Sequence, residues 1–209
     1  IFISNPNNPT GNCFNESTLL KIISAASGLV VIDEAYFNFS KTTLLKHIQR
    51  HKNLIILRTL SKIGLAGLRI GILISNEQLC SEIGKVRLPY NTNSISQAIA
   101  EIVLNRDFEI NKQIDKIISD RETLFMELAK IEEITPFKSK ANFILFKSDF
   151  PAEDLFEGLL SKGILVRHFG KKGALKDCLR VTVGTGLENG GFLEGLRDFI
   201  HAKESGKEL

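Results

Sequence analysis

The first half of the chain alternates short apolar runs with segments of helical periodicity. Such alternation is typical of strand and helix units that build a mostly parallel sheet. Four strands are expected, over residues 1–4, 29–32, 54–58 and 70–75. Helices are expected between and after them, over residues 15–23, 76–86 and 94–104, with Asn15 and Ser94 as N-caps. The pattern therefore predicts an α/β fold.

A longer helical pattern, over residues 107–131, separates this half from the rest. Beyond it the expected elements are strands over 143–146, 164–168 and 179–183, and helices over 151–162 and 188–202. These form a second, compact α/β unit. We expect three parts: residues 1–105 in a large domain, 106–135 in a connecting helix, and 136–209 in a small C-terminal domain.

Composition excludes several classes of protein. With 43% hydrophobic and 24% charged residues among 209, the chain is globular, and a net charge of +3 is too small to indicate nucleic-acid binding. No apolar run approaches the length of a membrane span. Cys13, Cys80 and Cys178 lie far apart, which favours reduced thiols in the cytoplasm. The histidines show no metal-binding spacing, so no metal site is expected.

Two polar motifs follow the first two expected strands, where α/β sheets place their sites. Residues 5–11 read NPNNPTG, and their prolines can present the amide of Asn8 in a fixed direction, although ordinary turn chemistry also explains them. Residues 33–36 read DEAY. Asp33 is either a helix cap or a carboxylate that needs a cationic partner such as a pyridinium nitrogen.

Two further motifs carry basic side chains. Lys62 follows the third expected strand among hydroxyls and glycines, and it can be an amine nucleophile or an ordinary exposed lysine. Arg180 lies inside an expected strand, and Arg167 lies at the end of another. Each arginine can pair structurally, but two guanidiniums that converge would bind a carboxylate or phosphate.

The order of seven motifs is more specific than any one of them. They are NPNNPTG (5–11), DEAY (33–36), RTLSK (58–62), GLAGLRIG (64–71), LPYNTN (88–93), ANFILF (141–146) and LRVTVGT (179–185). Over essentially its whole length the chain resembles the fold type I pyridoxal-phosphate enzymes, specifically the class II aminotransferases and, among these, the histidinol-phosphate aminotransferases. The resemblance implies that residues 1–105 are the C-terminal part of the large cofactor-binding domain.

The resemblance also implies roles for residues around pyridoxal 5'-phosphate. Lys62 would form the internal aldimine and shuttle the substrate proton, and Asp33 would hold the pyridine nitrogen protonated. Tyr36 and Asn8 would hydrogen-bond the ring's 3'-oxygen.

The phosphate and the substrate are assigned in the same way. Thr59, Ser61 and Arg69 would bind the cofactor phosphate, although Arg69 follows Lys62 by one residue fewer than is common in the superfamily. Arg180, assisted by Arg167, would receive the anionic end of the substrate.

The implied reaction is a ping-pong transamination that converts L-histidinol phosphate and 2-oxoglutarate to imidazole-acetol phosphate and L-glutamate. An aromatic aminotransferase or a threonine-phosphate decarboxylase of the same class is the alternative enzyme. A non-catalytic fragment is the other alternative, because the chain opens on a strand pattern without Met and upstream sequence is expected to be missing. The family implies a homodimer, with residues 90–93 as a candidate contact or a plain surface turn.

Overall fold

The computed structural model describes residues 1–170 and 172–206. They form two compact units. The first holds residues 1–8 and 12–115, and the second holds residues 9–11 and the described residues from 116 onward. The division falls inside one long helix, α5 (Asp107–Leu128). Among the described residues, none of the helices combines the length and apolar character needed to cross a membrane.

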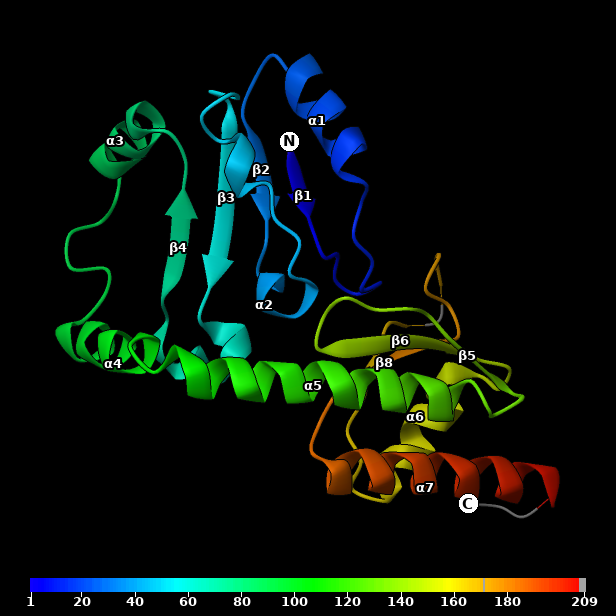
Figure 1. Cartoon of the computed structure of the whole chain (residues 1–209). Helices are drawn as coiled ribbons and strands as arrows, with labels where there is room; N and C mark the ends of the chain where they lie inside the picture. Colours follow the sequence, from blue (N-terminus) through cyan, green and yellow to red (C-terminus); the bar gives the residue numbers. More distant parts are fainter. Residues whose placement is uncertain (171, 207–209) are drawn as a thin grey trace. The chain divides into compact units, whose positions relative to one another are not determined.

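The first unit contains a four-stranded sheet in the order β1-β2-β3-β4. Its strands are β1 (Phe2–Ser4), β2 (Val30–Asp33), β3 (Leu54–Thr59) and β4 (Gly71–Ile74). The first three are parallel, and β4 runs antiparallel to β3, as its reversed arrow in Figure 1 shows. The mostly parallel sheet predicted from the alternating pattern is confirmed.

Helix α1 (Glu16–Ala25) covers one face of this sheet. Its Leu19 and Ile23 are buried against alternate residues of the two central strands. The buried cluster comprises Leu19, Ile23, Val30, Ile32, Leu44, Ile48, Leu54 and Ile56. Because side chains alternate along a strand, the residues between these positions face the opposite side of the sheet.

Asparagines cap the two later helices that lie wholly in the first unit, α3 (Glu77–Lys85) and α4 (Ser94–Leu104). Asn76 Oδ1 accepts a hydrogen bond from the Leu79 amide, and Asn93 Oδ1 accepts one from the Ser96 amide at 2.8 Å. The predicted cap at Ser94 is therefore wrong by one residue. Asn93 has the extended backbone of an N-cap residue and its side chain accepts the capping bond, so Ser94 becomes the first helical residue.

The second unit contains an antiparallel sheet in the order β5-β6-β8-β7. Its strands are β5 (Ile134–Pro136), β6 (Phe143–Ser148), β7 (Arg167–His168) and β8 (Cys178–Thr182). Its own helices are α6 (Ala152–Ser161) and α7 (Gly186–Glu204), and the end of α5 joins them.

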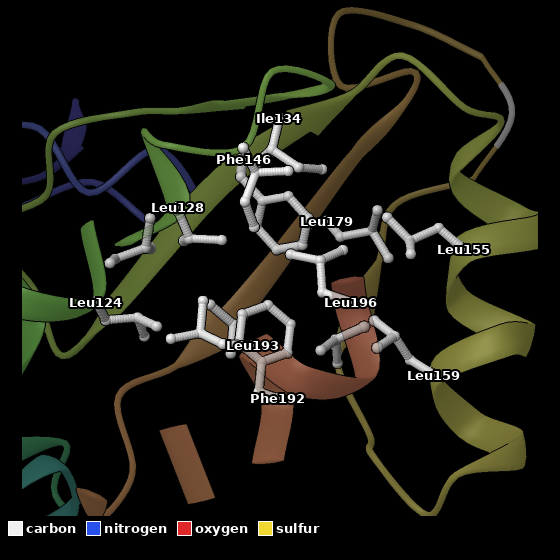
Figure 2. Packing of buried hydrophobic residues seen from close by; sticks show 14 of the residues in the cluster. Leu124, Leu128, Ile134, Phe146, Leu155, Leu159, Leu179, Phe192, Leu193 and Leu196 are labelled. Carbon is white, nitrogen blue, oxygen red and sulfur yellow. The ribbon is translucent and has the colours of Figure 1, made fainter. Parts of the chain in front are cut away.

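One face of this sheet is packed into a hydrophobic core. Figure 2 shows Phe146 of β6 and Leu179 of β8 meeting side chains from α5, α6 and α7. Leu128, Leu155 and Leu196 are among the fully buried members from those helices. Since the strands alternate, Arg180 faces the other side of the sheet. The core thus fixes β8 through Leu179 and Val181, and Arg180 lies on the opposite face.

Candidate active site

The first three motifs follow the carboxyl ends of β1, β2 and β3. These strands are parallel and adjacent, so the three loops leave the same edge of the sheet. Open α/β sheets place ligand sites at this edge. Seven of the predicted site residues come from this region, all of them in the first unit: Asn8, Asp33, Tyr36, Thr59, Ser61, Lys62 and Arg69.

An amide, a phenol and an amine meet at this edge. Asn8 Nδ2 donates a hydrogen bond to Tyr36 Oη at 3.4 Å, across two different loops. Lys62 Nζ lies 5.5 Å from the centroid of the Tyr36 ring. Tyr36 itself is only 7% exposed, so its ring is held in place by its surroundings. The structure therefore brings together three residues that lie in separate motifs.

Asp33 is the last residue of β2, and its register partners on the neighbouring strands are Ser4 and Leu57. Its Oδ1 accepts a hydrogen bond from the amide of Ala35 at 2.9 Å. This bond turns the chain after the strand rather than capping a helix, because α2 (Phe37–Ser40) has Tyr36 at its N-cap position. The half-buried carboxylate keeps further acceptor capacity at the strand end.

Hydroxyls surround the backbone at Lys62. Thr59 Oγ1 lies 2.9 Å from Ser61 Oγ and accepts a hydrogen bond from the Ser61 amide at 3.0 Å. These contacts begin the short 3₁₀ helix η2 (Ser61–Ile63), which ends at Gly64 with φ of 90°. Glycine suits this position because L side chains rarely adopt a positive φ.

Arg69 ends the next 3₁₀ helix, η3 (Ala66–Leu68), in a left-handed conformation with φ of 57°. Its Nη1 donates to the carbonyl oxygen of Ala66 at 3.2 Å, and the side chain is exposed. The guanidinium thus lies over its own loop. Its predicted contact with a phosphate remains a prediction.

Glu34 and Arg58 belong to two of the same motifs but are not among the predicted site residues. Glu34 is 1% exposed, and its Oε2 accepts hydrogen bonds from Arg58 Nε and Nη2 at 3.1 and 2.9 Å. The period-two pattern could have found them, since Glu34 follows Val30 and Ile32 on one face and Arg58 follows Leu54 and Ile56 on the same face.

In the second unit, Arg167 and Arg180 are direct partners across the antiparallel strands β7 and β8. Directly opposed residues of such a pair share a face of the sheet, with their Cβ atoms about 5 Å apart. The guanidinium of Arg180 also lies 4.8 Å from the centroid of the Phe143 ring on β6. The two arginines are therefore brought together, and their donors suit one carboxylate or phosphate.

Comparison with known proteins agrees with these motifs. Residues 1–195 match the family described as aminotransferase class I and II. The histidinol-phosphate aminotransferase of Aquifex aeolicus is 42% identical over 206 residues, which are 98% of this chain and 58% of that protein. Histidinol-phosphate aminotransferase 2 of Nitrosococcus oceani is 44% identical over 94% of this chain and 55% of its own length.

Solved structures give the same result. The histidinol-phosphate aminotransferase of Clostridium acetobutylicum has a TM-score of 0.87 at 27% identity, covering 94% of this chain and 62% of that one. The Sinorhizobium meliloti enzyme, in complex with pyridoxal-5'-phosphate, has a TM-score of 0.87 at 25% identity over 97% of this chain and 57% of that one. This chain thus spans less than two thirds of these relatives, and it belongs to the class I and II aminotransferase family.

Proposed function

We propose that the protein is a pyridoxal 5'-phosphate-dependent aminotransferase of histidine biosynthesis. It would convert L-histidinol phosphate and 2-oxoglutarate to imidazole-acetol phosphate and L-glutamate. The observation that carries the proposal is the meeting of Asn8, Tyr36 and Lys62 at the sheet edge beside Asp33. The substrate is proposed from the names of curated relatives with 42–44% identity.

The donor set fits this cofactor. An aromatic aldehyde with a basic ring nitrogen, a ring hydroxyl and a phosphate requires an amine, a carboxylate, neutral donors and hydroxyls around it. The loops after β1, β2 and β3 supply all of these within one unit. When bound, the cofactor supplies an aldehyde that reacts with amines and a ring that withdraws electrons from the substrate's α-carbon.

The protein's own residues would orient the ring and move the proton. Asp33 would accept a hydrogen bond from the protonated ring nitrogen, and Tyr36 with Asn8 would donate to the ring oxygen. Lys62 would bind the cofactor covalently and then carry a proton to and from the substrate's α-carbon. The hydroxyls of Thr59 and Ser61, together with Arg69, would bind the phosphate.

The paired arginines of the second unit would allow one site to bind two different substrates. Arg167 and Arg180 present two guanidiniums on one face of the sheet, and the planar fork of each matches carboxylate and phosphate alike. One site could then take the carboxylate of glutamate and the phosphate of histidinol phosphate in alternate half-reactions. This reuse is the physical reason to expect ping-pong kinetics.

We also propose a homodimer in the cytoplasm. Tyr90 is 98% exposed and stands in a left-handed backbone conformation with φ of 58°. It lines a hollow of ≈ 910 Å³ together with Arg87, Asn91 and Thr92. An exposed aromatic beside polar donors suits a contact with a second subunit.

The test is spectroscopic. The full-length protein, titrated with pyridoxal phosphate, should gain an absorbance band that disappears in Lys62→Ala. Added L-histidinol phosphate should then convert this band to that of the aminated cofactor. Conversion by phenylalanine but not by histidinol phosphate would favour an aromatic aminotransferase, and carbon dioxide release from threonine phosphate would favour the decarboxylase. Absence of any Lys62-dependent band would contradict the aminotransferase proposal, and a band in the full-length protein but not in the polypeptide of residues 1–209 would favour the non-catalytic fragment.

A further inference from the structure

We propose that Glu34 and Arg58 are positioning residues that hold Asp33 and Lys62 at a fixed separation. The inference rests on the proposed function, because it assigns the pair a purpose in holding the cofactor. The two residues lie at the carboxyl ends of β2 and β3, next to the chemical groups of the site but on the other face of the sheet.

The Glu34 carboxylate is fully engaged inside the protein. Besides the two bonds from Arg58, its Oε1 accepts a hydrogen bond from the Leu44 amide at 2.8 Å. Thr43 Oγ1 lies 2.8 Å from Oε2, and it accepts a bond from Arg58 Nη2 at the same distance. A buried charge with this many donors is fixed in one geometry.

Arg58 is fixed from a second side. Its guanidinium lies 3.7 Å from the centroid of the Phe37 ring in α2, the helix that directly follows Tyr36. The side chain therefore joins three segments: the strand that leads to Lys62, the turn after Asp33, and the helix after Tyr36. Lysine could not reproduce this arrangement, because it lacks the planar fork and the face that stacks on a ring.

Strand alternation explains how the pair acts on the site without touching it. Asp33 and Thr59 face one side of the sheet, and their neighbours Glu34 and Arg58 face the other, toward the α1 core. Any slippage between the ends of β2 and β3 would change the distance from the Asp33 carboxylate to the Lys62 amine. Errors of about 1 Å in such geometry reduce catalysis by about 100-fold.

The experiment compares Arg58→Lys with Ile48→Val in the full-length protein. Ile48 lies in the same buried cluster, so its loss of one methylene weakens the same core without touching the pair. Pyridoxal phosphate affinity, and the circular dichroism induced in the bound cofactor at saturation, are measured beside the thermal unfolding of each apoprotein. Arg58→Lys should lower the affinity by about 10- to 100-fold and weaken the induced signal, whereas Ile48→Val should leave both unchanged.

Glu34→Gln provides a second variant, since glutamine keeps the size of the side chain but loses its charge. It should change the cofactor's affinity and induced signal in the same direction. Equal cofactor binding by wild type, Arg58→Lys and Glu34→Gln would overturn the inference and leave the proposed function standing. Failure of both variants to fold would also overturn it, because the pair would then serve the fold itself. A wild-type protein without a Lys62-dependent band would overturn both proposals.

Discussion

Cys178 and Cys80 differ in burial and should differ in reactivity. Burial raises the pKa of the Cys178 thiol, and the nearby carboxylate of Asp177 adds to this effect against the opposing charge of Lys147. Cys80 is exposed. Because the thiolate is the reactive form, iodoacetamide at mildly alkaline pH should modify Cys80 in the native protein and Cys178 only after denaturation. Peptide mapping by mass spectrometry measures this, and labelling of Cys178 at the rate of Cys80 would contradict it.

Some residues at this sheet edge could be predicted from the sequence, and others could not. Lys62, Asp33 and Tyr36 each follow an expected strand, and the structure places them at one sheet edge. Glu34 and Arg58 stand 24 positions apart, and each looked like an ordinary part of its motif. The period-two pattern places both on one face of the sheet, but their pairing also depends on the register of β2 against β3.

At the scale of elements, the packing of α6 against α7 depends on Gly158. A Cβ added there would lie against Cδ2 and Cε2 of the buried Phe199 ring, well inside van der Waals distance. Gly158→Ala should therefore lower the free energy of unfolding by about 1–3 kcal/mol, as overpacking does. Denaturant unfolding followed by circular dichroism measures this change.

Gly190 in α7 is the matched control. Nothing lies within 4 Å of a Cβ added to it, so Gly190→Ala should be neutral or stabilise the protein by up to about 1 kcal/mol through helix propensity. Equal destabilisation by both substitutions would show that the contact with Phe199 is not the cause.

The N-terminus of α7 carries a capping box. Thr185 Oγ1 accepts a bond from the Glu188 amide, and Glu188 Oε2 accepts one from the Thr185 amide at 2.7 Å. Thr185→Ala should lower the free energy of unfolding by about 1 kcal/mol near neutral pH, whereas Thr123→Ala, at an exposed position of α5, should lower it by less.

The capping box should also depend on pH. Hydrogen bonds from the Thr185 backbone and side chain lower the pKa of Glu188 below its ordinary 4.5. Its contribution is therefore present above pH 4.5 and lost as the pH falls through the lowered pKa. The difference between wild type and Thr185→Ala should shrink in acid. A difference that stays constant down to low pH would exclude this role for Glu188.

Element boundaries were predictable to within a few residues, but three features were not. Strand β5 was not predicted, because Ile134–Pro136 is only three residues long and ends in proline, which usually interrupts a strand. The antiparallel order of the second sheet also gave no local signal, since β7 ends at His168 and β8 begins only at Cys178, too far apart in the sequence for a tight hairpin turn. The cap at Asn93 was missed because Ser94 beside it is an equally good capping residue.

At the scale of the whole molecule, one exposed segment predicts association. Val86 and Leu88 are 80% and 74% exposed and adjoin the exposed Tyr90. Apolar side chains gathered in this way favour contact with another surface. The polypeptide of residues 1–209 should self-associate in sedimentation experiments, and the double variant Val86→Lys, Leu88→Glu should shift it toward monomer. Identical sedimentation of the two proteins would exclude this segment as a contact.

The division of the chain into compact units could be predicted only in part from the sequence. The change of pattern after the long helix indicated two sheets, which the structure contains. The ranges 1–105, 106–135 and 136–209 remain a prediction, whereas the compact units divide within α5 and assign residues 9–11 to the second. Gly11 belongs there because its carbonyl accepts a bond from the Lys140 amide at 2.7 Å, a contact between distant residues that no local pattern encodes.

The alternation of side chains at the ends of β2 and β3 should be visible in the effects of single substitutions. Neighbouring residues here point to opposite faces of the sheet: Asp33 and Thr59 face the proposed cofactor site, and Glu34 and Arg58 face the buried core. Under the proposed function, a library of single substitutions, scored once for cellular abundance and once for growth without histidine, should separate these neighbours. Changes at Asp33 should abolish growth at normal abundance. Glu34→Gln should reduce growth alone, whereas larger changes at the buried Glu34 should reduce abundance as well, so one dipeptide would record two kinds of selection.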